Sequence, residues 1–143
     1  MEKLSLWLRR RGFRLEREAG ADDCVCFATA RVLINSKAAP ASQLSVLLHE
    51  CGHVDVLQHR LKNRRVRVAG ATLGQWGRTS NTRSRQNLGV RISVVTEEIE
   101  AWDRGEAIAK RLKIRYNRKT FKNVRTRALM TYFRWTARRR RGR

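Results

Sequence analysis

Two histidines and a glutamate are spaced along this chain as a zinc-dependent hydrolase requires. His49, Glu50 and His53 form an H-E-x-x-H motif inside an apolar run that predicts a helix. Residues four apart lie one turn above each other on one helix face, so the two imidazoles can hold one zinc ion. Glu50 leaves the same face and can accept a proton from a water that the metal activates. The motif therefore predicts metal-dependent hydrolysis, with Glu50 as the catalytic base.

A catalytic zinc site needs three protein ligands, so a third residue must come from elsewhere in the chain. Glu98 is the best candidate, because it lies on the apolar stripe of a helix predicted over residues 90–112. A buried carboxylate needs a cation partner, and the alternative to zinc is an arginine. Glu97 falls nearer the polar side of this helix and stays open as a replacement ligand. We predict that His49, His53 and Glu98 hold one Zn²⁺.

Gly52 lies inside the predicted motif helix, where glycine costs about 0.5–1 kcal/mol relative to alanine. Such a loss suggests a packing reason. We expect another element, such as the helix that carries the third ligand, to approach the motif helix closely at this position.

The three cysteines, Cys24, Cys26 and Cys51, have neither the even number nor the spacing of a disulfide framework. We expect a reduced, cytoplasmic protein and assign no cysteine a role. No apolar run approaches the roughly 18–20 residues of a membrane span, and the N-terminal residues lack the pattern of a secretory signal. A membrane is therefore not an expected partner.

The whole pattern predicts a single α+β domain over residues 1–137, in a chain of 143 residues. Hydrophobic spacing, β-branched content and turn residues indicate the elements. They are a helix at 2–11, a strand at 13–17, a second strand at 24–35 with a kink near 28–30, and helices from Pro40 to about His59, at 90–112 and at 119–137. A basic loop at 60–88 and a basic tail at 138–143 complete the chain.

The charge of the chain is extreme, with 33 Lys and Arg against 12 acids and a net charge of +21. No acid falls between Asp55 and Glu97, and none follows Glu106. A field of this sign and density attracts polyanions, so we expect DNA or RNA as a partner. The candidate contacts in the basic loop and tail are Arg78, Arg83, Arg85, Arg138, Arg139, Arg140 and Arg141.

The order of strand 31–35, the motif helix and the Glu98 helix resembles the minimal core of the zincin metallopeptidases, in the gluzincin type. The H-E-x-G-H form and the E-x-x-A element that begins at Glu98 are similar to the ImmA/IrrE-like metallopeptidases. The resemblance implies zinc ligands at His49, His53 and Glu98 and a general base at Glu50.

In the zincin core, the strand before the motif helix is the sheet edge that pairs with an extended peptide substrate. The resemblance therefore implies that Val32, Leu33 and Ile34 border the substrate cleft. The residue that stabilises the oxyanion stays open, with Tyr116, Tyr132 and arginine side chains as candidates.

Two functions follow from these observations. The first is a zinc-dependent endopeptidase that hydrolyses a protein or peptide substrate near nucleic acid. The alternative is a nucleic-acid-binding protein on a zincin scaffold, in which the metal is structural or lost. The predicted site residues support the endopeptidase, and the charge distribution supports the nucleic-acid-binding protein.

Overall fold

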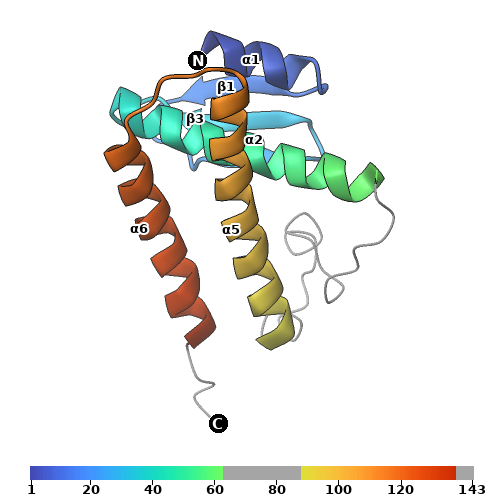
Figure 1. The fold of residues 1–143 in the computed structure, drawn as a ribbon, viewed down its shortest axis with the longest axis vertical. Coiled ribbons are helices and arrows are strands. Elements are labelled where there is room, and N and C mark those ends of the chain that lie inside the picture. The colour runs from blue at the N-terminus through green and yellow to red at the C-terminus, as the bar shows by residue number, and fades with distance from the viewer. Residues whose placement is uncertain (63–87, 138–143) are drawn as a thin grey trace.

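The computed structural model describes residues 1–62 and 88–137, which form four helices and a small mixed sheet (Figure 1). The α+β class and every predicted helix are confirmed, with helix ends shifted by a few residues. In chain order the elements are α1 (Glu2–Arg9), β1 (Arg14–Glu18), β2 (Cys24–Cys26), β3 (Arg31–Asn35), α2 (Pro40–Lys62), α5 (Leu88–Arg111) and α6 (Arg118–Ala137).

Most of the predicted basic loop and the whole basic tail lie outside the described residues. Residues 60–62 belong to the end of α2, and residue 88 begins α5. The seven arginines predicted to contact nucleic acid all lie outside the described residues: Arg78, Arg83, Arg85, Arg138, Arg139, Arg140 and Arg141. No helix in the described part of the chain is long and apolar enough to cross a membrane.

The sheet has the strand order β1-β3-β2, with β1 parallel and β2 antiparallel to β3. The prediction of one kinked strand over residues 24–35 is wrong, because the chain reverses there and Cys24 pairs with Leu33. The reversal places Ala30 at φ 51°, a left-handed conformation typical of tight turns. The predicted kink is therefore the turn of a hairpin.

The position of β3 also corrects the prediction that residues 31–35 form the substrate edge. β3 is the central strand, and Val32 and Ile34 are each 0% exposed. Leu33, which points to the other face, pairs with Glu16 on one side and Cys24 on the other. A peptide cannot add to a strand whose two edges are already paired, so β3 is a core strand.

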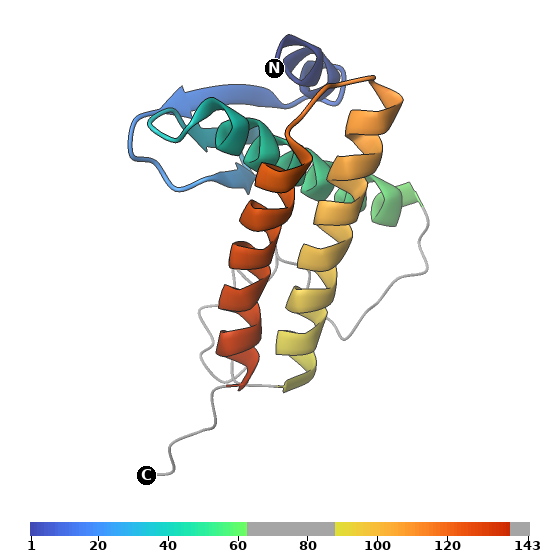
Figure 2. The same cartoon turned by 60° about the vertical axis from the view of Figure 1, so that its left-hand side comes forward.

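Helices α1 and α2 pack against the sheet, α5 and α6 pack on α2, and together they enclose one core. α2 crosses next to the sheet, and α5 and α6 run antiparallel, side by side, away from it (Figures 1 and 2). Side chains from α1, β3 and all three long helices meet in a single cluster. Its largest fully buried members are Trp102, Leu4, Leu8, Ile34, Leu47, Leu48 and Ile108. The core therefore fixes α2 and α5 relative to the sheet, and these two helices carry the motif residues.

Candidate metal centre

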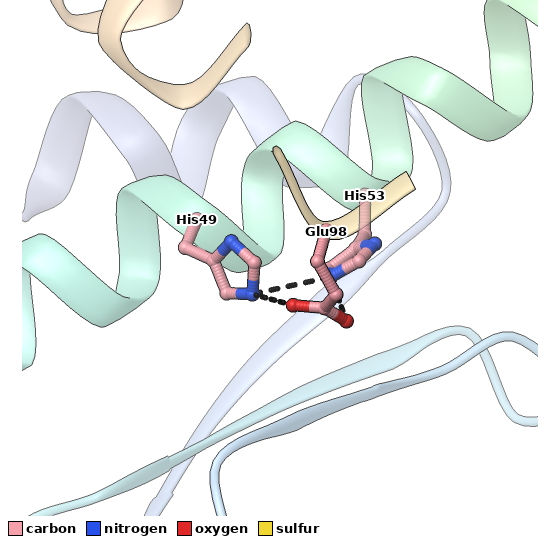
Figure 3. Close-up of side chains that lie close together, drawn as sticks. All are labelled: His49, His53 and Glu98. Atoms are coloured by element: carbon pink, nitrogen blue, oxygen red, sulfur yellow. Dashed lines mark hydrogen bonds and ion pairs between the residues drawn. The ribbon is translucent and has the colours of Figure 1, made fainter. Parts of the chain in front are cut away.

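His49, His53 and Glu98 converge between α2 and α5, and all three are buried (Figure 3). The two histidines lie one turn apart on α2, as their spacing predicts, and Glu98 faces them from α5. Glu98 is only 2% exposed, which agrees with its predicted place on the apolar stripe of its helix.

The potential ligand atoms of this trio lie close together. The Nε2 atoms of His49 and His53 are 3.2 Å apart. The carboxylate of Glu98 bridges the two rings, with Oε2 3.2 Å from Nε2 of His49 and Oε1 3.4 Å from Nε2 of His53. Among the described residues, this is the group of at least three His, Cys, Asp or Glu side chains that could hold a metal ion.

The spacing of the trio fits a tetrahedral zinc ion. Ligand atoms about 2.0–2.1 Å from such an ion are about 3.3 Å from each other, the edge of the tetrahedron. The two Nε2 atoms are 3.2 Å apart, and each lies 3.2 or 3.4 Å from a different oxygen of the Glu98 carboxylate. Nitrogen and carboxylate oxygen atoms are also the donor types that zinc takes in catalytic sites. The residues therefore suit a divalent cation in both chemistry and distance.

The electrostatics of the trio favour an ionised carboxylate beside the two rings. Burial opposes ionisation of Glu98, but hydrogen bonds from His49 and His53 lower the pKa of Glu98 to about 2. Burial also disfavours the charged form of His53 and so lowers its pKa. The hydrogen bond to Glu98 and the neighbouring carboxylates outweigh this effect and raise the pKa of His53 above its usual value. A fixed negative charge thus lies within reach of both imidazoles.

Glu50 occupies the same cavity as the trio. One of its carboxylate oxygens is 4.0 Å from Nε2 of His49, and its side chain is buried. Burial raises the pKa of Glu50, with a smaller opposing effect of His49. The cavity is about 200 Å³, which is room for water and part of a substrate. Its lining residues are Asp23, Cys24, Val25, Phe27, His49, Glu50, His53, Glu98 and Tyr132.

The predicted position of Glu97 on the polar side of its helix is wrong. Glu97 is 6% exposed and forms an ion pair with Arg60, which reaches across from α2. One Glu97 oxygen is also 4.0 Å from Nδ1 of His53, the ring nitrogen that faces away from Glu98. Glu97 therefore lies behind a histidine of the trio, although among the described residues Nδ1 of His53 has no hydrogen-bond partner, while Glu98 faces both histidines.

Two further contacts hold the site in place. The Trp102 ring stacks on the His49 ring, with centroids 4.2 Å apart and an interplanar angle of 16°. Arg104 on α5 pairs with Asp55 on α2 at 2.9 Å, so the Asp55 carboxylate serves the contact between helices. Asp55 therefore does not belong to the trio of His49, His53 and Glu98.

Tyr132 is the residue of the cavity that sequence reasoning could not select. It projects from α6 into the space beside Glu50 and Glu98. Burial raises the pKa of Tyr132, and the Glu98 carboxylate raises it further. Tyr116, the rival candidate, donates a hydrogen bond to Glu106 at 2.8 Å and does not line the cavity.

Comparisons with protein-family models, with curated proteins and with solved structures find no match to this chain. The functional inference therefore rests on the residues, distances and burial of the site.

Proposed function

We propose that this protein is a zinc-dependent endopeptidase with a gluzincin-type site, in which His49, His53 and Glu98 hold the metal. The observation that carries the proposal is the convergence of His49, His53 and the Glu98 carboxylate, whose ligand atoms lie within 4.8 Å of one another, beside the buried carboxylate of Glu50. The fold we infer for the chain is the zincin core of the ImmA/IrrE-like metallopeptidases.

Zinc at this position would polarise the scissile carbonyl and lower the pKa of water to about 7. Glu50 is placed to take the proton from the attacking water, because its carboxylate lies in the cavity beside His49. Glu50 then gives that proton to the amine that leaves, which completes general acid–base catalysis. Proton transfer through a positioned side chain accelerates reactions by about 10²–10⁴-fold.

Tyr132 is the chain's own hydrogen-bond donor for the charge that develops on the substrate carbonyl oxygen. Its hydroxyl belongs to the same cavity as Glu50 and Glu98. A raised pKa keeps this hydroxyl protonated, so it can donate. A donor aimed at a developing oxyanion typically contributes about 10²–10³-fold to the rate.

Strand β2 is the sheet edge that borders the cavity. Within residues 1–62 and 88–137, β2 pairs only with β3, and its residues Cys24 and Val25 line the cavity. An extended peptide that adds to the free edge of β2 would run past Glu50. A protein or peptide substrate suits this geometry, and β2 takes the role that sequence reasoning gave to β3.

The alternative function is nucleic-acid binding by a zincin scaffold whose metal is structural. Structural zinc sites are closed by four protein ligands, whereas catalytic sites keep one position open. The trio offers three ligand atoms and faces a cavity of about 200 Å³. This openness favours catalysis, and the basic surface then places the enzyme near DNA or RNA.

The test is cleavage of a random peptide library by zinc-loaded protein, with the products read by mass spectrometry. Glu50→Gln should keep one zinc per chain and lose cleavage by at least about 10²-fold. Glu16→Gln, at an exposed carboxylate of β1, is the matched control and should cleave normally. Equal cleavage by Glu50→Gln and wild type would refute the proposal.

A further inference from the structure

The turn between α5 and α6 carries a dense group of exposed positive charges. Residues 110–122 contain seven basic side chains, and every one of them is exposed. We refer to them as the basic turn: Lys110, Arg111, Lys113, Arg115, Arg118, Lys119 and Lys122. The basic turn is distinct from the basic loop at 60–88 and the basic tail at 138–143 that are predicted from the sequence.

Little negative charge balances the basic turn. Among the described residues, Lys110 is the one member with an ion pair, at 3.7 Å from Glu106. The chain carries no acid after Glu106. Like charges held this close repel each other, so the arrangement costs stability unless an anion binds there.

Helix α1 adds to the same charged surface. The ammonium of Lys3 donates a hydrogen bond to the carbonyl of Leu112 at 3.0 Å, which places α1 against the turn (Figure 1). Burial lowers the pKa of Arg11, Asp55 opposes this, and the charge of Arg111 lowers that pKa further, which indicates that the Arg11 and Arg111 side chains lie near each other. Two segments that are far apart in sequence therefore present positive charge together.

Lys113 lies at a backbone position that is unfavourable for a residue with a side chain. It has φ 51°, and its neighbour Ile114 donates a backbone hydrogen bond to the carbonyl of Ala109 at 2.9 Å. This is the usual way for a helix to end, and glycine normally occupies the left-handed position. A left-handed conformation costs a residue with a side chain about 1–2 kcal/mol.

The side chains of the basic turn distinguish between two polyanionic partners, an anionic membrane surface and nucleic acid. Proteins that lie on membranes insert large apolar side chains between their basic residues. The exposed large apolar residues of the described chain are Met1, Leu6, Leu88, Ile92, Met130 and Phe133. None of them lies in residues 110–122. The basic turn therefore lacks side chains that could insert into a membrane and is suited to the solvent-exposed phosphates of nucleic acid.

We infer that the basic turn is the surface on which this protein binds the phosphate backbone of nucleic acid. The inference goes beyond the proposed peptidase activity, because it depends on surface charge and not on the metal centre. Arg118 and Tyr132 are fourteen positions apart on α6, which is about 20 Å along a helix. Nucleic acid at the turn would therefore leave the cavity open.

The test compares two variants that lose the same charge from different places. One carries Lys113→Gln, Arg115→Gln, Lys119→Gln and Lys122→Gln, all within the basic turn. The other carries Arg14→Gln, Lys37→Gln, Arg127→Gln and Arg134→Gln, at exposed positions outside the basic turn and helix α1. Binding to a fluorescein-labelled DNA duplex is measured by anisotropy between about 50 and 200 mM salt, with and without zinc.

The turn variant should bind more weakly, and its salt dependence should fall by about one unit of slope for each phosphate contact removed. The control variant should keep the wild-type slope, and zinc should change neither result. Equal losses in the two variants, or none in the turn variant, would overturn the inference. A failed peptidase assay would leave this result unaffected.

Two further measurements check that the basic turn contacts DNA directly and that its charge does not serve membrane binding. Acetylation of Lys113, Lys119 and Lys122 in the wild type should be suppressed by DNA, which checks the contact without any substitution. Binding to phosphatidylserine-containing vesicles should be the same for both variants. Unprotected lysines, or a turn variant that loses vesicle binding but keeps DNA binding, would also overturn the inference.

Discussion

A Cβ atom at Gly52 would lie 1.8 Å from the backbone carbonyl oxygen of Ala101. A second close approach occurs at Gly105, where a Cβ would lie 2.3 Å from the carbonyl oxygen of Leu48. Helices α2 and α5 therefore contact each other backbone to backbone at two points. The expected close approach at Gly52 is confirmed, and it brings Glu98 within reach of the histidines that flank this glycine in sequence.

Gly52→Ala should destabilise the protein by about 2–4 kcal/mol, because the backbone of Ala101 cannot yield as a flexible side chain would. It should also weaken zinc binding, since separating α2 from α5 withdraws Glu98 from the histidines. Urea unfolding and a zinc competition titration measure the two effects. Ala107→Ser, on the exposed side of α5, is the control and should change stability by less than about 0.5 kcal/mol.

Substitutions at Glu97 and Glu98 should have different consequences for metal binding. Glu98→Gln removes a ligand and should abolish tight zinc binding. Glu97→Gln removes a carboxylate 4.0 Å from Nδ1 of His53 and should weaken zinc binding by about 10–100-fold. Titration against a chromogenic chelator distinguishes the two. Loss of zinc in the Glu97 variant alone would show that Glu97 is the third ligand.

Tyr132→Phe should lower kcat/KM by about 10²-fold while leaving zinc content unchanged. The affinity of Tyr132→Phe for a phosphonamidate transition-state analogue should fall by a similar factor. Substrate binding should not change: a peptide should bind Glu50→Gln, which does not cleave it, as tightly as it binds the double variant Glu50→Gln and Tyr132→Phe. Tyr116→Phe is the matched control, because that hydroxyl bonds to Glu106. An unchanged kcat/KM for Tyr132→Phe would exclude the assigned role.

Tyr116→Phe should instead affect stability in a pH-dependent way. The hydrogen bond from Tyr116 lowers the pKa of Glu106, so the bond stabilises the fold above the unfolded pKa of about 4.3. This contribution is lost as pH falls through the folded pKa. We expect a loss of about 0.5–1 kcal/mol near pH 7, where the partly exposed pair is screened by solvent, and little difference near pH 3. Urea unfolding at both pH values, repeated in a Glu106→Gln background, checks the pairing.

Lys113→Gly should stabilise the fold by about 0.5–1 kcal/mol, because glycine adopts φ 51° without the steric cost of a side chain. Lys113→Ala keeps that cost and should not raise the melting temperature. Both variants lose the same charge and should weaken DNA binding equally. A melting temperature for Lys113→Gly below that of Lys113→Ala would contradict this account of the turn.

The helices and the convergence of His49, His53 and Glu98 were predictable because local patterns encode them. The i, i+4 spacing of His49 and His53 fixes their common face, and the apolar periodicity around Glu98 places that carboxylate on the buried side of α5. Turn residues and periodicity are local properties, so they survive in the sequence alone. The division of residues 24–35 into two strands was missed, because Ala30 gives no sequence sign of its left-handed conformation.

The features that the sequence could not give depend on contacts between distant segments. Glu97 is buried because Arg60 of α2 covers it, which no periodicity of α5 can reveal. Tyr132 reaches the cavity because α6 folds back along α5 (Figure 2). β3 is central because β1 pairs in parallel with one of its edges, while β2, the other strand of the hairpin, pairs with the opposite edge. Each of these three features depends on a tertiary partner that the local pattern does not encode.

The central claim is that His49, His53 and Glu98 form a zinc centre, and zinc content tests it most directly. Inductively coupled plasma mass spectrometry on protein purified without a metal-affinity tag should find one zinc per chain in the wild type. Glu98→Ala, purified alongside and shown to be folded by circular dichroism, should contain little or none. A folded wild type without zinc, which also fails to take up added zinc, would contradict the account.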